Sequence, residues 1–311
     1  MKHPIMTKIL VATEKAFAKT AVEGIKNIIS EAGYEISLLE NYTNADDLIK
    51  AVADADAMII RSDKATQQVI EAGKNLKLIV RAGAGYDNID LAAATSKGIV
   101  AMNTPGQNSN AVAELTFGML VFMARGNFKG GSGTELKGKK IGIHAYGNVG
   151  KNVARIAKGF DMDVYAFDPF VAREVIEKDG IKGVDSVEEL YSTCHYISLN
   201  IPATEKTKNS INLELLSKMP IGATVINTAR KEVINEAELK QVFEKRPDFK
   251  YISDIMPGNH EELLKFENRY YCTPKKQGAE TAEANINAGL AAANQIVDFF
   301  KNGVTKFQVN K

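Results

Sequence analysis

The stretch KIGIHAYGNVGKNVARIAKGF, residues 140–160, decides the fold of the second half of this chain. A short β-branched run leads into a glycine turn and then an amphipathic run, which is the order strand, turn, helix. Residues 145–150 form an A-x-G-x-x-G version of a dinucleotide-binding turn. In such a turn Gly147 lets the backbone approach a pyrophosphate, Gly150 lets the helix pack on the strand, and the helix N-terminus offers N–H groups to the anion. Because Ala145 replaces the first glycine, the motif alone is equally consistent with a purely structural turn.

An aspartate at the end of the next expected strand strengthens the cofactor interpretation. The run DVYAFD ends in Asp168, 18 residues after Gly150. A carboxylate there binds both hydroxyls of an adenosine ribose and repels a 2′-phosphate. Pro169 and Phe170 supply no adjacent cation, so the sequence favours NAD over NADP. Arg173 is near enough in sequence to keep the NADP alternative open.

Strand-like apolar runs alternate with helical runs over nearly the whole chain. The expected strands are residues 8–13, 35–40, 57–62, 76–83, 98–103, 140–145, 163–168, 196–202, 223–228, 251–255 and 270–273. Helices are expected at 15–31, 44–53, 65–73, 90–96 and 109–125, with a long Ala-rich helix near the C-terminus. This alternation is typical of parallel sheets covered on both faces. Two series of strands, separated by Asn103-Thr104-Pro105-Gly106, predict two α/β domains.

Composition limits the classes of function. A length of 311 residues suits about two domains and a sizeable core. The net charge is +1, with 39 basic and 38 acidic residues well mixed, so nothing indicates a nucleic-acid or membrane partner. Cys194 and Cys272 are too few for a disulfide framework or a metal site, which fits a reducing compartment. Without a membrane-length apolar run or a cleavable leader, we expect a cytoplasmic protein that holds no metal.

Polar side chains follow most of the expected strands, at the edge where open parallel sheets bind ligands. These strand ends carry residues 145–150, Asp168, Asn200-Ile201-Pro202, Thr228-Ala229-Arg230, Asp254, Pro274-Lys275, Arg61-Ser62-Asp63, 81–85 and Asn103-Thr104. Each arginine also has a structural explanation. Arg230 is equally well a helix-start or surface residue, and Arg61 and Arg81 could pair with Asp63 or Asp87. Taken together, the strand ends predict a site for NAD and an anionic small molecule.

Several segments, taken in order, make the sequence recognisable. They are VRAGAGYDNIDLAAATSKGI (80–99), MNTPGQNSNAVAELTFGML (102–120), GTELKGKKIGIHAYGNVGKNVA (133–154), SLNIPATEKTKNSIN (198–212), VINTARKEVINEAEL (225–239) and TPKKQGAETAEA (273–284). They resemble the D-2-hydroxyacid dehydrogenase family, and within it the short-form 3-phosphoglycerate dehydrogenases. The resemblance implies an α/β fold of two Rossmann-like parallel-sheet domains, one flavodoxin-like and one NAD-binding, with an interdomain cleft. It implies a substrate-binding domain at 1–104 plus 285–311, an NAD-binding domain at 105–284, and a homodimer.

The resemblance also implies roles for individual residues. Arg230 would bind the substrate carboxylate and polarise the carbonyl for hydride attack. Asp254 would contact the nicotinamide carboxamide. The implied substrate-binding residues are Arg61, Arg81, Ala82, Gly83, Ala84 and Asn108. The implied cofactor-binding residues are Tyr146, Gly147, Asn148, Val149, Gly150, Asp168, Asn200, Ile201, Pro202, Thr207, Thr228, Ala229 and Asp254.

The chain departs from the family at the acid/base. Family members have Thr-Pro-His, whereas this chain has Thr-Pro-Lys, with Lys275 in place of the imidazole. The glutamate that holds the family's histidine corresponds to Asn259, although Glu261 or Glu262 could serve instead. A lysine has a usual pKa near ~10.4. Loss of the carboxylate, with a guanidinium nearby, lowers such a pKa. We therefore expect Lys275 to be the general acid/base, and Lys276 to be a solvated neighbour or a phosphate contact.

These features support one leading function and two alternatives. The leading interpretation is NAD-dependent oxidation of 3-phospho-D-glycerate to 3-phosphohydroxypyruvate, which feeds serine biosynthesis. A glyoxylate or hydroxypyruvate reductase of the same family would need fewer cations for its unphosphorylated substrate. A non-catalytic NAD-sensing protein is favoured by the loss of both the histidine and the glutamate, while Arg230 and Lys275 count against it.

Overall fold

The computed structural model describes residues 6–311, which form two compact units. One unit comprises the chain up to Asn108 together with Thr281–Lys311, and the other is Ser109–Glu280. The expected domain boundaries, after residues 104 and 284, each lie four residues from these divisions. Each unit has its own parallel sheet and its own apolar cores.

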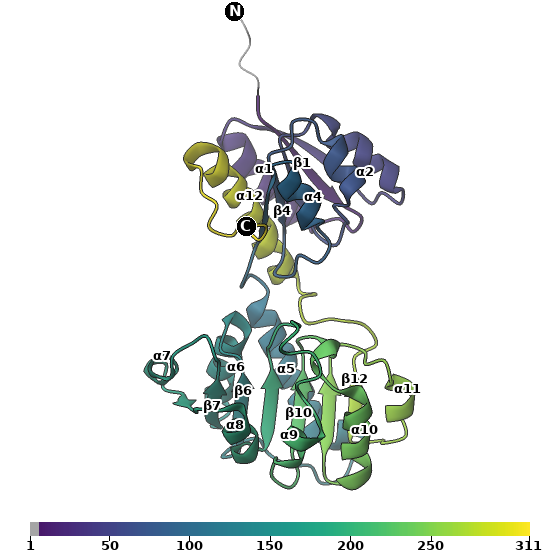
Figure 1. The fold of residues 1–311 in the computed structure, drawn as a ribbon, viewed down its shortest axis with the longest axis vertical. Helices are drawn as coiled ribbons and strands as arrows, with labels where there is room; N and C mark the ends of the chain where they lie inside the picture. Colours follow the sequence, from purple (N-terminus) through teal and green to yellow (C-terminus); the bar gives the residue numbers. More distant parts are fainter. Residues whose placement is uncertain (1–5) are drawn as a thin grey trace, which may run out of the picture. The chain divides into compact units, whose positions relative to one another are not determined.

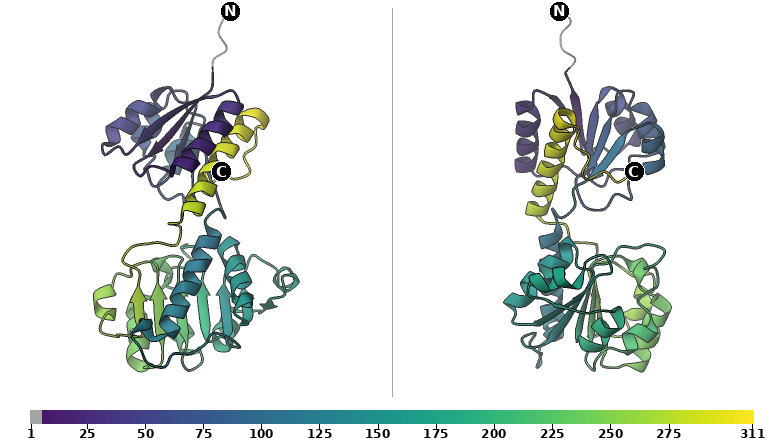
Figure 2. Two further views of the ribbon diagram at one scale, coloured as in Figure 1. Left: turned by 180° about the vertical axis from the view of Figure 1, so that it is seen from behind. Right: turned by 60° about the vertical axis from the view of Figure 1, so that its left-hand side comes forward.

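The first unit is built on a five-stranded parallel sheet with the order β2-β1-β3-β4-β5 (Figure 1). The strands are β1 (Lys8–Thr13), β2 (Glu35–Glu40), β3 (Ala57–Ile60), β4 (Leu78–Arg81) and β5 (Val100–Asn103). One face is covered by α1 (Lys19–Glu31) and α12 (Ala282–Asn302), which lie side by side although they are far apart in the chain (Figure 2). The other face is covered by α2 (Ala45–Ala51), α3 (Gln67–Ala72) and α4 (Leu91–Ser96). The strand order is that of flavodoxin-like domains.

Burial on both faces explains why these strands read as unbroken apolar runs. In β1, Ile9 and Val11 pack toward α1 and α12, whereas Leu10 and Ala12 pack toward α2, α3 and α4. All four side chains are at most 1% exposed. Successive side chains of a strand point to opposite faces, so a sheet with helices on both faces needs apolar residues at every position.

The second unit is built on a seven-stranded parallel sheet with the order β12-β11-β10-β9-β6-β7-β8. The strands are β6 (Lys140–His144), β7 (Asp163–Phe167), β8 (Lys182–Gly183), β9 (Tyr196–Leu199), β10 (Thr224–Asn227), β11 (Lys250–Ser253) and β12 (Tyr270–Cys272). Counted within the unit, this is the Rossmann order with one further strand at the edge. The short β8 was not predicted, because a two-residue strand with a lysine and a glycine leaves no apolar run.

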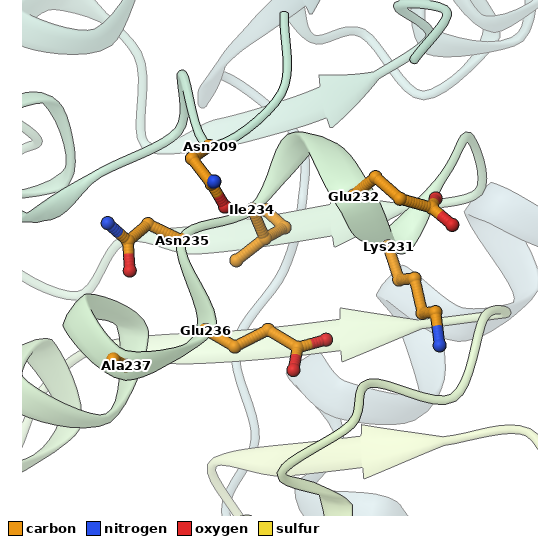
Figure 3. Close-up of a pocket in the computed structure, with 7 residues that line it drawn as sticks. All are labelled: Asn209, Lys231, Glu232, Ile234, Asn235, Glu236 and Ala237. Carbon is orange, nitrogen blue, oxygen red and sulfur yellow. The ribbon is translucent and has the colours of Figure 1, made fainter.

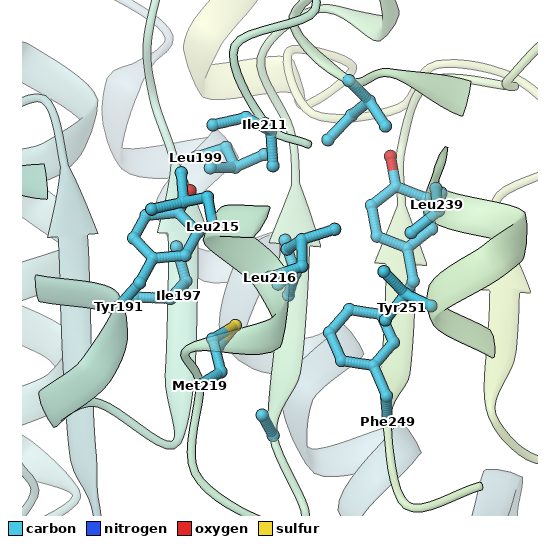
Figure 4. Close-up of a cluster of buried hydrophobic side chains, with 14 of the residues drawn as sticks. Tyr191, Ile197, Leu199, Ile211, Leu215, Leu216, Met219, Leu239, Phe249 and Tyr251 are labelled. Atoms are coloured by element: carbon cyan, nitrogen blue, oxygen red, sulfur yellow. The ribbon is translucent and has the colours of Figure 1, made fainter. Parts of the chain in front are cut away.

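Helices cover both faces of the second sheet as well. One face packs on α5 (Ser109–Ala124) and α6 (Asn148–Gly159). The other packs on α8 (Val187–Thr193), α9 (Leu213–Ser217) and α10 (Glu236–Lys245), and Figure 4 shows its core, with Tyr191, Leu216 and Tyr251 among the buried side chains. The remaining helices are α7 (Arg173–Lys178), α11 (His260–Leu263) and the 3₁₀ turns at Val52–Asp54, Gly126–Phe128 and Lys231–Val233. The predicted fold class, with two Rossmann-like parallel sheets, is confirmed.

Each strand order fixes a point where the order reverses and where ligands bind in such sheets. In the first unit this point lies between the loops that follow β1 and β3, and in the second between those that follow β6 and β9. Residues 61–63 follow β3, and the turn 145–150 follows β6. The predicted site residues therefore include those at both reversal points. Within residues 6–311, no helix has the length and apolar character needed to cross a membrane.

Candidate active site

The two glycines of the turn after β6 have different structural roles. Gly147 is the N-cap of α6, with φ −84° and ψ −158°, and a Cβ built there would meet no atom within 4 Å. A Cβ on Gly150 would lie 2.3 Å from the carbonyl oxygen of Ala145 and 3.0 Å from Cγ2 of Ile143. Gly150 therefore permits close packing of the helix on the strand, while Gly147 leaves open space in front of the helix N-terminus. Ala145 itself adopts φ 79°, a conformation that favours glycine.

Asp168, which follows β7, lies directly against this turn. Its carboxylate accepts a hydrogen bond from the backbone N–H of Tyr146 at 2.8 Å and another from that of Phe170 at 2.8 Å. The nearby Arg173 forms ion pairs with Glu177 at 2.8 Å and Asp185 at 3.0 Å. Because the guanidinium is already balanced by two carboxylates, it is a poor partner for a 2′-phosphate.

The ring of Tyr146 belongs to the core of the second unit. Its side chain is 2% exposed, and its hydroxyl donates to Asp179 at 3.0 Å. Burial raises the pKa of this phenol, so it stays neutral. Binding of a cofactor by Tyr146 stays a prediction, and it concerns the backbone of this residue, because the side chain is buried. Gly147 and Asn148 are exposed, and Val149 is half-buried.

The loop after β9 offers a buried acceptor. Asn200 donates from Nδ2 to the carbonyl oxygen of Ser198 at 3.2 Å, and its Oδ1 is buried without a hydrogen-bond partner among residues 6–311. Thr207 closes the loop by donating to the carbonyl oxygen of Pro202 at 2.6 Å. Ile201 is buried and belongs to the core of the second unit. An orphaned amide oxygen at the reversal point of the sheet suits the polar groups of a cofactor.

The Asn-Thr-Ala-Arg turn after β10 is organised by Asn227, which is fully buried. Its Nδ2 donates to the carbonyl oxygen of Arg230 at 2.9 Å and to the hydroxyl of Tyr251 at 3.1 Å, and its Oδ1 accepts from the N–H of Ala229 at 3.0 Å. These bonds fix the backbone that carries the half-buried Arg230. Thr228 has a buried Oγ1 with no partner in the part of the chain that the structure describes, which is a second orphaned polar atom at this edge.

Asp254, after β11, holds the loop that carries the two lysines. It is 1% exposed and accepts from Oγ1 of Thr273 at 2.7 Å, from the N–H of Gln277 at 2.9 Å and from the N–H of Gly278 at 2.8 Å. Residues 273–278 therefore wrap around one buried carboxylate, a role that the sequence did not predict. Lys275 is exposed at the outside of this loop, and within residues 6–311 it makes no hydrogen bond or ion pair. A contact of Asp254 with a nicotinamide stays a prediction.

Asn259 and its acidic neighbours turn toward α10. Asn259 donates from Nδ2 to the carbonyl oxygen of Glu236 at 2.8 Å. Glu262 forms an ion pair with Lys240, also on α10. Neither residue is hydrogen-bonded to Lys275 in this structure, so the structure gives no direct support to a pairing of Lys275 with Asn259 or Glu262.

In the first unit, Arg61 and Arg81 lie together at the ends of β3 and β4. Arg61 donates to the carbonyl oxygen of Lys15 at 3.1 Å and to Oδ1 of Asn285 at 2.5 Å. Arg81 donates from Nε to the carbonyl oxygen of Arg61 at 3.0 Å. Gly83 has φ 151°, and a Cβ there would lie 1.5 Å from Nη1 of Arg81. The glycine is therefore needed for this guanidinium to lie against the backbone of residues 82–84.

Asp63 has a structural role at this edge of the sheet that the sequence did not predict. It is 1% exposed and accepts from the N–H of Glu14 at 2.6 Å, the hydroxyl of Tyr42 at 2.7 Å and the N–H of Arg61 at 3.0 Å. The carboxylate thus binds the backbone of Arg61 and joins the loops that follow β1 and β3. No local signal could have found this role, because the partners are distant in sequence.

The other predicted substrate residues belong to the same unit as these arginines. Ala82 is buried, and Ala84 accepts from Nδ2 of Asn103 at 2.6 Å. Asn108 is half-buried in the turn that precedes α5. Within residues 6–311, no group of three His, Cys, Asp or Glu side chains is arranged to hold a metal ion.

A separate hollow of about 390 Å³ lies next to the turn that carries Arg230 (Figure 3). Its lining residues are Asn209, Lys231, Glu232, Ile234, Asn235, Glu236 and Ala237. Two carboxylates and one ammonium group give this lining a net negative charge. The hollow is therefore unsuited to an anionic substrate.

Residues 11–310 match the family model of the D-isomer specific 2-hydroxyacid dehydrogenases, catalytic domain. The chain belongs to the D-2-hydroxyacid dehydrogenase family. The predicted membership is confirmed, and the reversal point of the second sheet lies in two of the segments on which it was based, 133–154 and 198–212.

Relatives of this dehydrogenase chain include enzymes with two different names. It is similar to the NAD⁺-bound 3-phosphoglycerate dehydrogenase of Entamoeba histolytica, with 49% identity, a TM-score of 0.88, and coverage of 98% of this chain and 99% of that one. It is 35% identical to D-3-phosphoglycerate dehydrogenase of Methanocaldococcus jannaschii, over 91% of this chain and 56% of the relative. It is also 35% identical to hydroxypyruvate reductase of Thermotoga maritima, over 84% of this chain and 90% of the relative. The chain thus spans about half the length of several curated phosphoglycerate dehydrogenases that it matches.

Proposed function

We propose that this protein is an NAD-dependent 3-phosphoglycerate dehydrogenase that supplies 3-phosphohydroxypyruvate for serine biosynthesis. The observation that carries the proposal is the likeness to the Entamoeba histolytica enzyme, at 49% identity over 98% of this chain. Arg61 and Arg81, which follow or end neighbouring strands and are joined by a hydrogen bond from Nε of Arg81 to the carbonyl oxygen of Arg61, support a phosphorylated substrate, because a dianionic phosphate is well matched by two arginines.

The residues at the edge of the second sheet fit a dinucleotide. The open space at Gly147 and the N-terminus of α6 suit a pyrophosphate, and Asp168 suits the ribose hydroxyls. The buried, unpartnered oxygens of Asn200 and Thr228 suit the remaining polar groups. When bound, NAD⁺ supplies the hydride acceptor for the oxidation.

The substrate is held by cations and one backbone donor. Arg61 and Arg81 bind the phosphate, and the backbone N–H of Ala84 binds the carboxylate. The N–H groups of Ala82 and Gly83 do not take part, because they already donate to the carbonyl oxygens of Ile60 at 2.8 Å and Arg81 at 2.9 Å. Arg230 binds the carboxylate and the oxygen that becomes the carbonyl, where it stabilises the negative charge that develops on that oxygen. Asn227 acts as a positioning residue, because its three hydrogen bonds fix the turn that carries Arg230.

Lys275 is the general acid/base in this proposal. During oxidation the hydroxyl proton passes to Nζ of Lys275 as the hydride leaves the substrate carbon, so the C–O single bond becomes a carbonyl. During reduction Lys275 returns the proton to the alkoxide. Asp254 positions Lys275 by holding the loop 273–278 through Thr273, Gln277 and Gly278.

The first experiment measures NADH oxidation with 3-phosphohydroxypyruvate, hydroxypyruvate and glyoxylate. A value of kcat/KM at least about tenfold higher with the phosphorylated acid supports the proposal, since tenfold corresponds to about 1.4 kcal/mol from the phosphate contacts. A preference for hydroxypyruvate would favour the second candidate, a hydroxypyruvate reductase, which the relative from Thermotoga maritima supports. NADH binding without turnover would favour a sensor and contradict both.

The role of Lys275 is tested with a matched pair of variants. We expect Lys275→Ala to lower kcat by about 10²–10⁴-fold, as for loss of a general acid/base, with NADH affinity unchanged. The neighbouring Lys276→Ala keeps kcat and changes at most KM. Wild-type turnover by Lys275→Ala would end the acid/base assignment without affecting the assignment of the substrate.

A further inference from the structure

We propose that the amino-terminal edge of the seven-stranded sheet holds a second, separate site for a phosphate-sized oxyanion, formed by Lys139, His195 and Lys250. Lys139 immediately precedes β6, His195 immediately precedes β9, and Lys250 is the first residue of β11. In the order β11-β10-β9-β6, these parallel strands all begin at the same edge, which brings the three side chains together. They line one cavity of about 220 Å³.

The cavity is distinct from the candidate active site. The dinucleotide turn follows the carboxyl end of β6, whereas Lys139 lies before its amino end. Five residues of strand at about 3.3 Å each separate the two edges by roughly 16 Å. Every residue that lines the cavity belongs to the second unit.

The cavity gathers basic side chains without a carboxylate in its lining. Lys139 donates to Oγ1 of Thr134 at 2.9 Å, and Nδ1 of His195 is buried without a partner among residues 6–311. Within the same residues, Lys139, His195 and Lys250 take part in no ion pair. By contrast, Lys182 on the same sheet is paired with Asp163 at 3.0 Å. The three bases therefore lack the counter-charge that other cations of this unit have.

The neighbouring carboxylates do not supply this counter-charge. Asp248 is committed to Arg246 at 2.6 Å and to the N–H of Gly222 at 2.8 Å. Glu135 raises the pKa of Lys139, but its effect is smaller than the lowering caused by burial and by the charge of Lys250. Burial and the charge of Lys250 lower the pKa of Lys139, and burial and the charges of Lys139 and Lys140 lower the pKa of His195. A positive potential of this kind is relieved by a bound anion.

Side chains, and not the backbone, recognise the anion. The N–H groups at this edge are already used, by His195 to the carbonyl oxygen of Lys140 at 3.1 Å, by Thr224 to His195 at 2.8 Å and by Lys250 to Ala223 at 2.9 Å. Two ammonium groups and an imidazolium supply the charge-assisted hydrogen bonds that a phosphate or a similar dianion accepts. The walls contributed by Leu120 and Met123 of α5 leave room for a small apolar body attached to it.

Binding is expected to be linked to protonation of His195. An anion beside the imidazole favours the charged form and raises its pKa, so binding takes up a proton. Affinity therefore increases as the pH falls through the lowered pKa of free His195. The titratable groups that influence this linkage are Lys139, Lys140, Lys250, Glu135, Asp248 and Tyr196.

The experiment titrates the full-length protein with inorganic phosphate at constant ionic strength and follows Tm and calorimetric binding. At several times its Kd, phosphate should raise Tm by about 2–4 °C, and chloride should not. In an Arg61→Met background, which removes a phosphate contact proposed for the substrate site, the double variant Lys139→Met with Lys250→Met should lose this shift, while the exposed-lysine control Lys178→Met should keep it. The variant His195→Gln should keep part of the binding and lose the pH dependence that exceeds that of the ionisation of phosphate itself.

A further variant separates this site from the proposed substrate site. Arg61→Met alone should keep the part of the phosphate shift that comes from this second site, because Arg61 belongs to the other unit. Loss of the whole shift in Arg61→Met, its persistence when the two lysine substitutions are added to Arg61→Met, or its absence in the wild-type protein would each overturn the proposal. None of these outcomes depends on the identity of the enzyme's substrate.

Discussion

Replacing Gly150 by alanine tests whether close packing of α6 on β6 builds the dinucleotide turn. The new methyl group would lie 2.3 Å from the carbonyl oxygen of Ala145 and 3.0 Å from Cγ2 of Ile143. The first of these atoms is backbone, so the helix has to move, and such overpacking costs about 1–3 kcal/mol. Alanine recovers up to about 1 kcal/mol, because Gly150 lies within a helix. The free energy of unfolding should therefore fall by about 1–2 kcal/mol, or about 2–8 °C in Tm.

Gly147→Ala is the matched control, because nothing lies within 4 Å of its Cβ and its φ is −84°. Its unfolding by urea, followed by circular dichroism, should match the wild type. Its NADH affinity, followed by fluorescence, should fall at least tenfold, or about 1.4 kcal/mol, because the methyl group would enter the open space in which we propose that the pyrophosphate binds. Wild-type stability of Gly150→Ala, or wild-type NADH binding by Gly147→Ala, would refute the division of roles between the two glycines.

Three further substitutions test other parts of the second unit. Burial lowers the pKa of His144 to about 4. The stability that the neutral imidazole contributes is therefore fully present above about pH 6.5 and is lost as the pH falls from there toward 4. Between pH 7 and pH 5 the free energy of unfolding in urea should fall by about 2 kcal/mol more for the wild type than for His144→Gln, and equal losses would contradict this. Ala145→Gly should stabilise by about 0.5–1 kcal/mol, because relief of the positive φ exceeds the added chain entropy; a lower urea midpoint would disprove it. Asn227→Ala should cost about 2–4 kcal/mol and lower kcat through Arg230. Asn227→Asp keeps the acceptor for Ala229 but loses both donated bonds and buries a carboxylate beside the carbonyl oxygen of Arg230, so it should cost at least as much; equal kcat in all three proteins would rule out positioning.

The strands and the glycine turn could be predicted from local sequence. Each main strand is a short apolar run, because both faces of both sheets are covered by helices, and the predicted runs 8–13 and 35–40 match β1 and β2 residue for residue. The predicted run 76–83 is longer than β4, because its last residues already form the loop that holds Arg81. Strand boundaries were predicted less precisely for this reason, since small residues such as Ala82 and Gly83 continue the apolar run beyond the end of the strand.

The candidate site was predicted less completely, because contacts between distant residues leave no local pattern. Asp168 and the turn 145–150 follow from spacing, since both lie at the ends of neighbouring strands. The burial of Tyr146 did not follow, because its ring turns into the core from within a glycine turn. The use of Asp254 to hold residues 273–278 was equally invisible, since it depends on the pairing of β11 with β12.

The sequence by itself determined the elements of this protein and their parallel pairing, because apolar periodicity, turn residues and strand–helix alternation are local properties of the chain. It also determined that cations and a dinucleotide turn follow the strands. Only the tertiary structure decided which of these residues meet. Asn285 reaches Arg61 across 224 positions, and Lys139, His195 and Lys250 share one cavity although they start three different strands. The physical reason is the order of the strands in each sheet. This order places the ends of strands that are distant in sequence side by side, and no single segment of sequence encodes it.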